Sequence, residues 1–506
     1  MDSPRITSIH ILDDDSLLNV FYLYRPFLLG KDDDDEDCFK RERQHWDSER
    51  WWHHLTHVCQ RWRNLIFGSA SYLRLSLLCT EGTPVADMLA HSPPLPLVVE
   101  YSEKFPGTSV EDKEGIILAL KQRNRVRRVR LHTPITILQK FIVAIENEYP
   151  ILEYLIIWSW TEDNTTSVMF PETFHAPHLH HLALLGLTLP IGSRLLTTAV
   201  RLGTLCLVMT HSSIYSNPNT LLQWLSFMPQ LETLKINLYF CPNSDEERQL
   251  MHPPVRTPVT LPHLHHFSFH GHTSTYLDAL FHRITPCPKK LEIYFPNQST
   301  FFVPRLVQFM KTTWNLKFES VKFKFYRWKV SVVVYPHGEA KMYALSATAR
   351  SWDFDWLVSY VAQVSNSLGQ VFSAVERLTL EREDEADDWT FEDTDADENG
   401  FDRIEWRQLL RSFSNVKTLL IDNMFVEGVS RCLELEDGGF PLELLPELQE
   451  LTYSASGNIG DAFTSFIDAR QNADRPITLV HHNPSPDLVH VPSEPSSITA
   501  ASIEAE

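Results

Sequence analysis

The stretch MPQLETLKINL, residues 228–238, carries the pattern on which the fold of this chain depends. Leu231, Leu234 and Ile236 form a Leu-x-x-Leu-x-Leu-like entry into a β-strand. The segment TLLQWLSF, residues 220–227, stands directly ahead of it and has the apolar spacing of a helix. The stretch therefore predicts a helix followed by a strand.

The same phrase recurs, often after a proline, along most of the chain. It is found at 149–158, 176–190, 199–209, 261–271, 288–295, 372–381, 413–422 and 445–453. Its leading leucines recur about every two to three dozen residues, near the period of a leucine-rich repeat. One strand and one helix cannot close a core, so neighbouring units must stack and pair their strands in parallel. We therefore expect an α/β fold, an irregular leucine-rich-repeat solenoid (horseshoe) over 81–480 with a strand-lined concave face.

Two segments depart from this pattern. Between 296 and 370 the repeat weakens, and residues 321–347 alternate with period two, which predicts an ordinary hairpin. The final residues, 481–506, are rich in serine and proline, and this composition predicts a disordered tail.

Residues 1–80 are expected to form a separate small helical domain. Apolar side chains in 51–66 recur at steps of three and four, which predicts one helix, capped by Ser48 and stopped at Gly68. A second short helix is expected over 12–25, ended by Pro26, and an acidic insert at 27–47 separates the two. Two short helices cannot bury both apolar stripes on each other, so they need a third surface, either the rest of the chain or a partner.

Composition excludes several classes of function. The net charge is −20, and the acidic runs at 32–37 and 381–402 repel nucleic acid and anionic membrane. We interpret the one basic cluster, KQRNRVRRVRLH at 121–132, as a solvated sheet face. The seven scattered cysteines contain no C-x-x-C pair, and no signal peptide or membrane span is evident, so a cytoplasmic or nuclear protein with reduced thiols is expected.

The sequence offers only weak candidates for metal binding or catalysis. The run 393–406 resembles a calcium-binding EF-hand loop, but Trp406 stands where the closing glutamate is needed. The histidine clusters at 175–181 and 263–272 are interpreted as loop and sheet-surface residues, because His180 and His181 point to opposite faces of a strand. No nucleophile, metalloprotease or phosphate-binding motif occurs, so no enzyme, metal or other cofactor is expected.

A family resemblance enters at the amino-terminal helices. ILDDDSLLNVF, residues 11–21, matches the leading L-P-x-D/E-x-L-x-x-I/V-F motif, and WWHHLTHVCQRWRNLI, residues 51–66, matches L-x-x-V-C-x-x-W-R. In this order they resemble an F-box, the domain that docks proteins onto the Skp-type adaptor of cullin ubiquitin ligases. The continuation at 68–101, with the irregular repeats, is similar to the large F-box-like families of mushroom-forming fungi.

The resemblance implies a noncatalytic substrate receptor that holds an unknown target protein on its repeat surface. It also implies a set of adaptor-binding and domain-core residues: Leu12, Leu17, Leu18, Phe21, Leu55, Val58, Cys59, Trp62 and Ile66. Partner contact is expected for Leu12, Leu17 and Leu18, and internal packing for Cys59 and Trp62. Asp13 occupies the usual proline position, so a repeat scaffold with a degenerate F-box, not linked to ubiquitin transfer, stays open as the alternative.

Overall fold

The computed structural model describes residues 12–25, 50–103, 109–145, 147–160, 168–190, 192–209, 218–238, 258–272, 274–296, 301–311, 318–337, 344–351, 353–383, 403–434, 443–453 and 460–481. The chain divides into two compact units. The first comprises Met1–Leu316 and Tyr343–Ser351, and the second comprises Lys317–Met342 and Trp352–Glu506. The acidic insert at 27–47 lies outside the described residues, as does the predicted tail after residue 481.

The described part of the first unit begins with three short helices: α1 (Asp14–Tyr24), α3 (Trp51–Thr56) and α4 (Gln60–Gly68). Asp13 caps α1, since its carboxylate accepts a hydrogen bond from the backbone N–H of Ser16 at 2.7 Å. The helix predicted over 12–25 is thus confirmed.

The prediction of one continuous helix over 51–66 is wrong. The chain leaves the helix after Thr56, and Cys59 has extended backbone with φ −160° before α4 begins. The Thr56 hydroxyl bonds back to the carbonyl of His53 at 2.7 Å, and Arg63 donates to the carbonyl of Thr56 at 3.0 Å. These side chains satisfy carbonyls that a helix end leaves without partners, so the break is stabilised locally.

A parallel sheet forms the body of the first unit. Its strands, in spatial order, are β1 (Leu77–Cys79), β2 (Leu97–Ser102), β3 (Val126–Pro134), β4 (Tyr154–Trp160), β6 (His181–Leu185), β8 (Thr204–Met209), β9 (Thr233–Leu238), β11 (His266–His270), β13 (Lys290–Phe295) and β16 (Leu345–Arg350). Two small parallel pairs lie apart from it, β5 (Val168–Met169) with β7 (Leu187–Thr188) and β10 (Val259–Thr260) with β12 (Ile284–Thr285).

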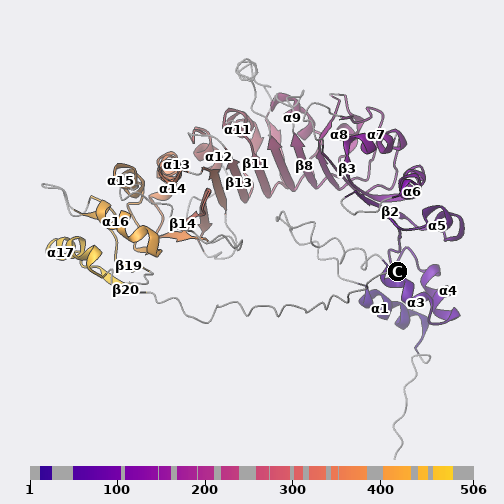
Figure 1. The fold of residues 1–506 in the computed structure, drawn as a ribbon, viewed down its shortest axis with the longest axis horizontal. Coiled ribbons are helices and arrows are strands. Elements are labelled where there is room, and N and C mark those ends of the chain that lie inside the picture. Colours follow the sequence, from indigo (N-terminus) through magenta and orange to yellow (C-terminus); the bar gives the residue numbers. More distant parts are fainter. Residues whose placement is uncertain are drawn as a thin grey trace, which may run out of the picture. The chain divides into compact units, whose positions relative to one another are not determined.

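Helices cover one face of this sheet (Figure 1). They are α5 (Val85–His91), α6 (Val110–Leu120), α7 (Ile135–Ala144), α8 (Arg194–Thr198), α9 (Pro218–Leu225), α11 (Ser274–Phe281) and α12 (Leu306–Lys311). Under them a row of side chains runs from strand to strand in register: Leu155, Leu182, Leu205, Leu234, Phe267, Leu291 and Leu345. All seven are buried, so the alternate positions of each phrase make one continuous core.

The second unit contains the predicted hairpin, β14 (Phe318–Phe325) antiparallel to β15 (Lys329–Pro336). From β14 the sheet continues in parallel through β17 (Arg377–Arg382), β18 (Thr418–Ile421), β19 (Glu450–Tyr453) and β20 (Thr478–His481). The helical segments are α13 (Phe354–Ser367), α14 (Gly369–Phe372), α15 (Arg403–Arg411), η4 (Asn423–Phe425), α16 (Val426–Leu433), η5 (Gly460–Phe463) and α17 (Thr464–Asn472). Trp406 of α15 is fully buried, with its ring 6.4 Å from that of Phe325.

The expectation of an α/β chain built on a large, mostly parallel sheet is confirmed. Each of the nine recurring phrases contains a strand, from β4 in 149–158 to β19 in 445–453. The described ranges hold no helix long and apolar enough to cross a lipid bilayer.

Candidate functional site

The amino-terminal helices pack around an aromatic contact. The rings of Phe21 and Trp62 meet edge to face with centroids 4.8 Å apart, joining α1 to α4. Leu17 of α1 and Ile66 of α4 are also fully buried. This core uses one face of each helix, as the spacing of apolar residues predicts.

A polar clamp fixes the start of α1 onto α4. Arg61 donates through Nη2 to Asp14 Oδ1 at 2.7 Å and to the carbonyl oxygen of Leu12, also at 2.7 Å. Backbone and side-chain hydrogen bonds from Ser16 lower the pKa of the neighbouring Asp13. That carboxyl therefore stays ionised at neutral pH, beside the positive end of the helix dipole.

The nine residues predicted from the F-box resemblance do not form one surface. Leu17, Phe21, Trp62 and Ile66 are buried; Leu18, Leu55 and Cys59 are half-buried; Leu12 and Val58 are exposed.

The break after Thr56 explains this division, because it turns Val58 away from the stripe in which an unbroken helix would place it. Leu17 packs inside the domain, whereas partner contact was expected for it.

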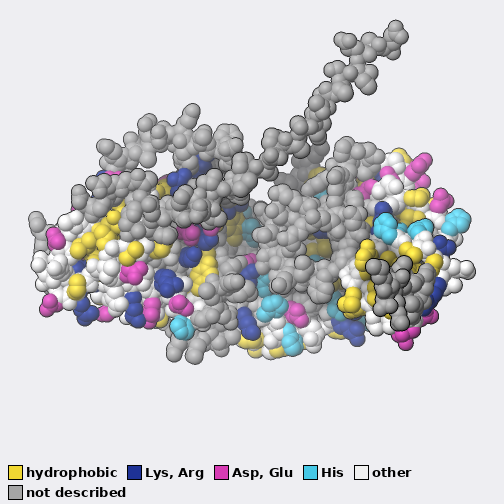
Figure 2. Space-filling model, turned by 90° about the horizontal axis from the view of Figure 1, so that it is seen from below, with side chains coloured by type: hydrophobic (Ala, Val, Ile, Leu, Met, Phe, Trp, Pro, Cys, Tyr) yellow, Lys and Arg dark blue, Asp and Glu magenta, His cyan; other side chains and the backbone are white. Residues whose placement is uncertain are grey.

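Helix α1 carries a second, exposed apolar stripe. Its members Val20 and Leu23 were not predicted, and Tyr24 was expected to lie on the same stripe as Leu17 and Phe21. Val20, Leu23 and Tyr24 are 44%, 81% and 60% exposed, and their spacing of three and four places them along one side of the helix. The signal was present in the sequence beside Leu17 and Phe21, but both stripes together make α1 apolar around much of its circumference. Figure 2 shows hydrophobic side chains at the surface on the right of the view, the end at which Figure 1 places these helices.

The sheet face of the first unit that faces away from the helices carries charged and aromatic side chains. Arg128, Tyr154 and His181 stand side by side on β3, β4 and β6. The Arg128 guanidinium lies 4.8 Å from the centre of the Tyr154 ring, which stacks on His181 at 5.7 Å. The expected sheet face at 121–132 is therefore found on β3, from Val126 onward.

Two histidines of this face have strongly altered acidity. Burial, together with the positive charges of Lys235 and Arg130, lowers the pKa of His181 to about 4. Burial and the charge of Arg350 do the same for His270, whose pKa is also about 4. Both imidazoles are consequently neutral at pH 7, so the positive charge of this face comes from arginine and lysine.

The histidines of the clusters at 175–181 and 263–272 were interpreted as loop and sheet-surface residues. This interpretation is wrong for His266. This side chain is buried, with Nε2 at 3.2 Å from Glu292 Oε2, while Lys290 Nζ lies 3.1 Å from Glu292 Oε1. Within the described ranges, no group of three or more histidine, cysteine, aspartate or glutamate side chains is placed to hold a metal ion. The acidic part of the EF-hand-like run, 393–402, lies outside these ranges.

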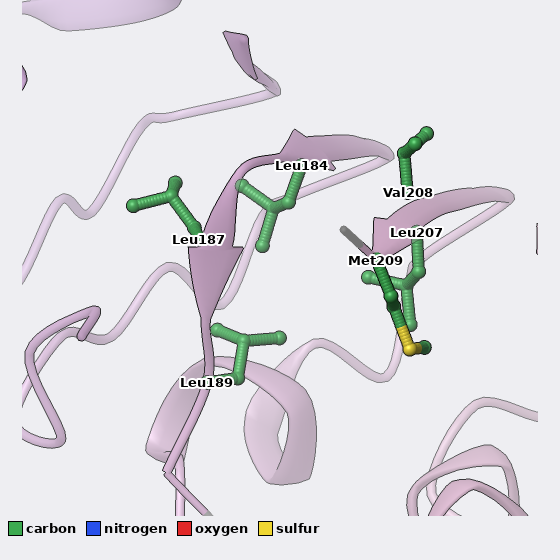
Figure 3. Close-up of a pocket in the computed structure, with 6 residues that line it drawn as sticks. All are labelled: Leu184, Leu187, Leu189, Leu207, Val208 and Met209. Carbon is green, nitrogen blue, oxygen red and sulfur yellow. The ribbon is translucent and has the colours of Figure 1, made fainter. Parts of the chain in front are cut away.

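An apolar hollow is lined by residues in and next to β6, β7 and β8. Leu184, Leu187, Leu189, Leu207, Val208 and Met209 line it (Figure 3). None of these side chains ionises or donates a hydrogen bond, so the hollow carries no acid, base or nucleophile.

Burial weakens the acidity of two of the described cysteine thiols. None of the described cysteines forms a disulfide. Burial raises the pKa of Cys79 to about 11 and raises that of Cys287 further, so both remain thiols at neutral pH. The chain matches no protein-family model and none of the curated proteins with which its sequence was compared.

Proposed function

We propose that this chain is a noncatalytic substrate receptor of a Skp, cullin and F-box type ubiquitin ligase. In this proposal α1, α3 and α4 form an F-box-like domain that docks on a Skp-type adaptor. The strands and helices that follow form an irregular leucine-rich-repeat solenoid that holds the target protein. The proposal rests on the motifs at 11–21 and 51–66 and on the apolar surface that the helices leave exposed.

The observation that carries the proposal is the exposed stripe of Val20, Leu23 and Tyr24. A small domain that buries Leu17 and Phe21 gains nothing in its own stability from a second apolar stripe in water. Exposed apolar patches of this kind commonly mark sites where another protein docks. A helix of the adaptor laid against α1 would bury these side chains.

The mechanism needs no chemistry within this chain. A target bound to the same polypeptide as the adaptor meets the assembled ligase at high effective concentration. Positioning of this kind accelerates ubiquitin transfer by proximity alone. The receptor's contributions are two binding surfaces and a folded connection between them.

Co-purification with a Skp-type adaptor tests the proposal. Val20→Asp with Leu23→Asp places charge in the exposed stripe while leaving the buried face of α1 intact, and we expect it to abolish adaptor retention. Val110→Asp with Val143→Asp is the matched control, because it adds the same charge at two apolar side chains that are 71% and 70% exposed on α6 and α7. Failure of the full-length protein to retain the adaptor, or equal retention by the Val20/Leu23 double variant, would show that the proposal is wrong.

One observation favours a second candidate, an interaction scaffold with a degenerate F-box. Asp13, whose carboxylate is exposed at the start of α1, stands where the family motif carries proline. Asp13 has taken a capping role there. A scaffold would bind its partner but leave the lifetime of that partner unchanged when the gene is deleted, and a cycloheximide chase of the bound protein distinguishes the two.

A further inference from the structure

The sheet face of the first unit that faces away from its described helices, here called the open face, brings together residues that are far apart in the sequence. Parallel register aligns Arg130 of β3 with Ile156, Ala183 and Cys206, and then with Lys235 of β9. Side chains at register partners point to the same side of a sheet. Arg130 and Lys235 therefore stand in one row across the strands.

On the described strands the open face carries a surplus of cationic side chains, although the chain as a whole has a net charge of −20. Between β2 and β16 its cationic side chains are Arg128, Arg130, Lys235, Lys290 and Arg350, and its carboxylates are Glu100 and Glu292. Cations thus outnumber carboxylates on these strands. A local field of opposite sign to the net charge attracts anionic groups to this face selectively.

Aromatic rings hold two of these charges in place. Arg128 stacks on Tyr154, and the guanidinium carbon of Arg350 lies 5.2 Å from the centre of the Tyr294 ring. Nearby, His132 and Trp160 have ring centres 4.4 Å apart. Stacked guanidinium groups and aromatic rings are the residue types that anchor protein partners at interfaces.

Spacing along the sheet limits the shape of the ligand. Four strand spacings of about 4.8 Å separate Arg130 from Lys235, which places their backbones about 19 Å apart. An extended peptide advances about 3.3 Å per residue, so about six residues span that distance. A single small anion cannot reach both positions, whereas an extended segment with two separated acidic groups can.

We infer that the open face binds an extended acidic segment of the target protein, with carboxylate groups about six residues apart over Arg130 and Lys235. This inference rests on the proposed receptor function, because it names the kind of target that the receptor holds. Nucleic acid is the weaker fit, since a chain with a net charge of −20 repels a polyanion more strongly than a short acidic segment.

Fluorescence anisotropy with the full chain and no adaptor tests the inference. One probe is a labelled peptide whose two Glu-Glu pairs lie six residues apart, and a second probe of the same composition has its four glutamates together. We expect Arg130→Gln with Lys235→Gln to weaken binding of the spaced peptide about tenfold at low salt, and salt to weaken it in the wild type. The contiguous peptide is expected to bind less tightly.

Lys121→Gln with Lys140→Gln is the matched control, because it removes the same charge from exposed positions away from the open face. Equal losses in the two double variants would overturn the inference, as would tighter binding of a twelve-nucleotide oligouridylate that the Arg130/Lys235 variant also loses. Binding that appears only when Asp32–Asp37 are changed to asparagine or serine would overturn it too, because the chain's own acid would then be the occupant.

Further variants distinguish failure of this inference from failure to fold and from failure of the proposed function. If Arg130→Gln with Lys235→Gln does not fold, Lys235→Gln alone is expected to weaken the spaced peptide about threefold, in keeping with one partly exposed charge pair. Val20→Asp with Leu23→Asp should leave peptide binding unchanged. Adaptor retention should likewise survive Arg130→Gln with Lys235→Gln, so failure of one proposal is not mistaken for failure of the other.

Discussion

Phe21→Ala is expected to unfold the amino-terminal helices while the sheet stays intact. Phe21 is 1% exposed and its ring meets that of Trp62. Truncation of a buried phenylalanine to alanine costs about 3–5 kcal/mol. A core this small rarely supplies more than about 3–5 kcal/mol in total, so the loss is comparable with the whole stability of the domain.

Removal of the polar clamp shows whether the ion pair or the aromatic packing contributes more to the stability of these helices. The ion pair between Arg61 and Asp14 has side-chain exposures of 37% and 61%. Exposed pairs of this kind contribute about 0–1 kcal/mol, so Arg61→Ala should leave the helices folded. Phe21→Leu keeps most of the buried volume and should cost less than Phe21→Ala.

Hydrogen exchange read by mass spectrometry separates these cases, because it reports local opening segment by segment. In Phe21→Ala, peptides from 12–25 and 50–75 should exchange at the rate of an unfolded chain, while peptides covering β3 and β4 keep their protection. Unchanged protection of 12–25 in Phe21→Ala, or a larger effect of Arg61→Ala, would refute the assignment of this stability to aromatic packing.

Three further predictions concern residues outside the amino-terminal helices. Gly186 has φ +74°, and a Cβ there would meet the carbonyl oxygen of Ser159, so Gly186→Ala should cost about 2–4 kcal/mol in urea unfolding. Arg470 donates three hydrogen bonds of 3.0–3.1 Å to carbonyls of the loop 445–448, and Arg470→Met should cost about 3 kcal/mol, seen as an earlier unfolding transition of the second unit. His181 has a folded-state pKa of about 4 against an ordinary value of 6.5, so its contribution is complete above pH 6.5 and is lost as pH falls toward 4. Stability should drop by about 2 kcal/mol from pH 7 to pH 5, and His181→Asn should reduce that drop.

The strands were predictable because each buries a fixed pattern of leucines. Leu155, Leu182 and Leu205 repeat the same register from strand to strand, and burial of these positions leaves the sequence little freedom. The pairing of β16 with β13 was not predictable in the same way. The hairpin of β14 and β15 stands between them in the sequence, and the period of the repeat says nothing about which strand follows an insertion.

The candidate site was predicted less completely than the fold. Apolar spacing identified Phe21 and Trp62 as partners in a core, but it could not show the break before Cys59, which depends on bonds made by the side chains of Thr56 and Arg63. Sequence alone also could not place Glu292 beside His266, because strands that are distant in the chain bring them together.

The two proposed surfaces rest on different physical forces. Burial of Val20 and Leu23 is a short-range, apolar effect that salt does not screen. Attraction of an acidic segment to Arg130 and Lys235 is electrostatic and falls off over about 8 Å at physiological ionic strength. Because neither force depends on the other, substitutions on the open face are expected to change target preference without weakening the proposed docking of α1 on an adaptor. The proposed receptor would thus keep one docking mode while its target preference varied with a few charged positions on the strands.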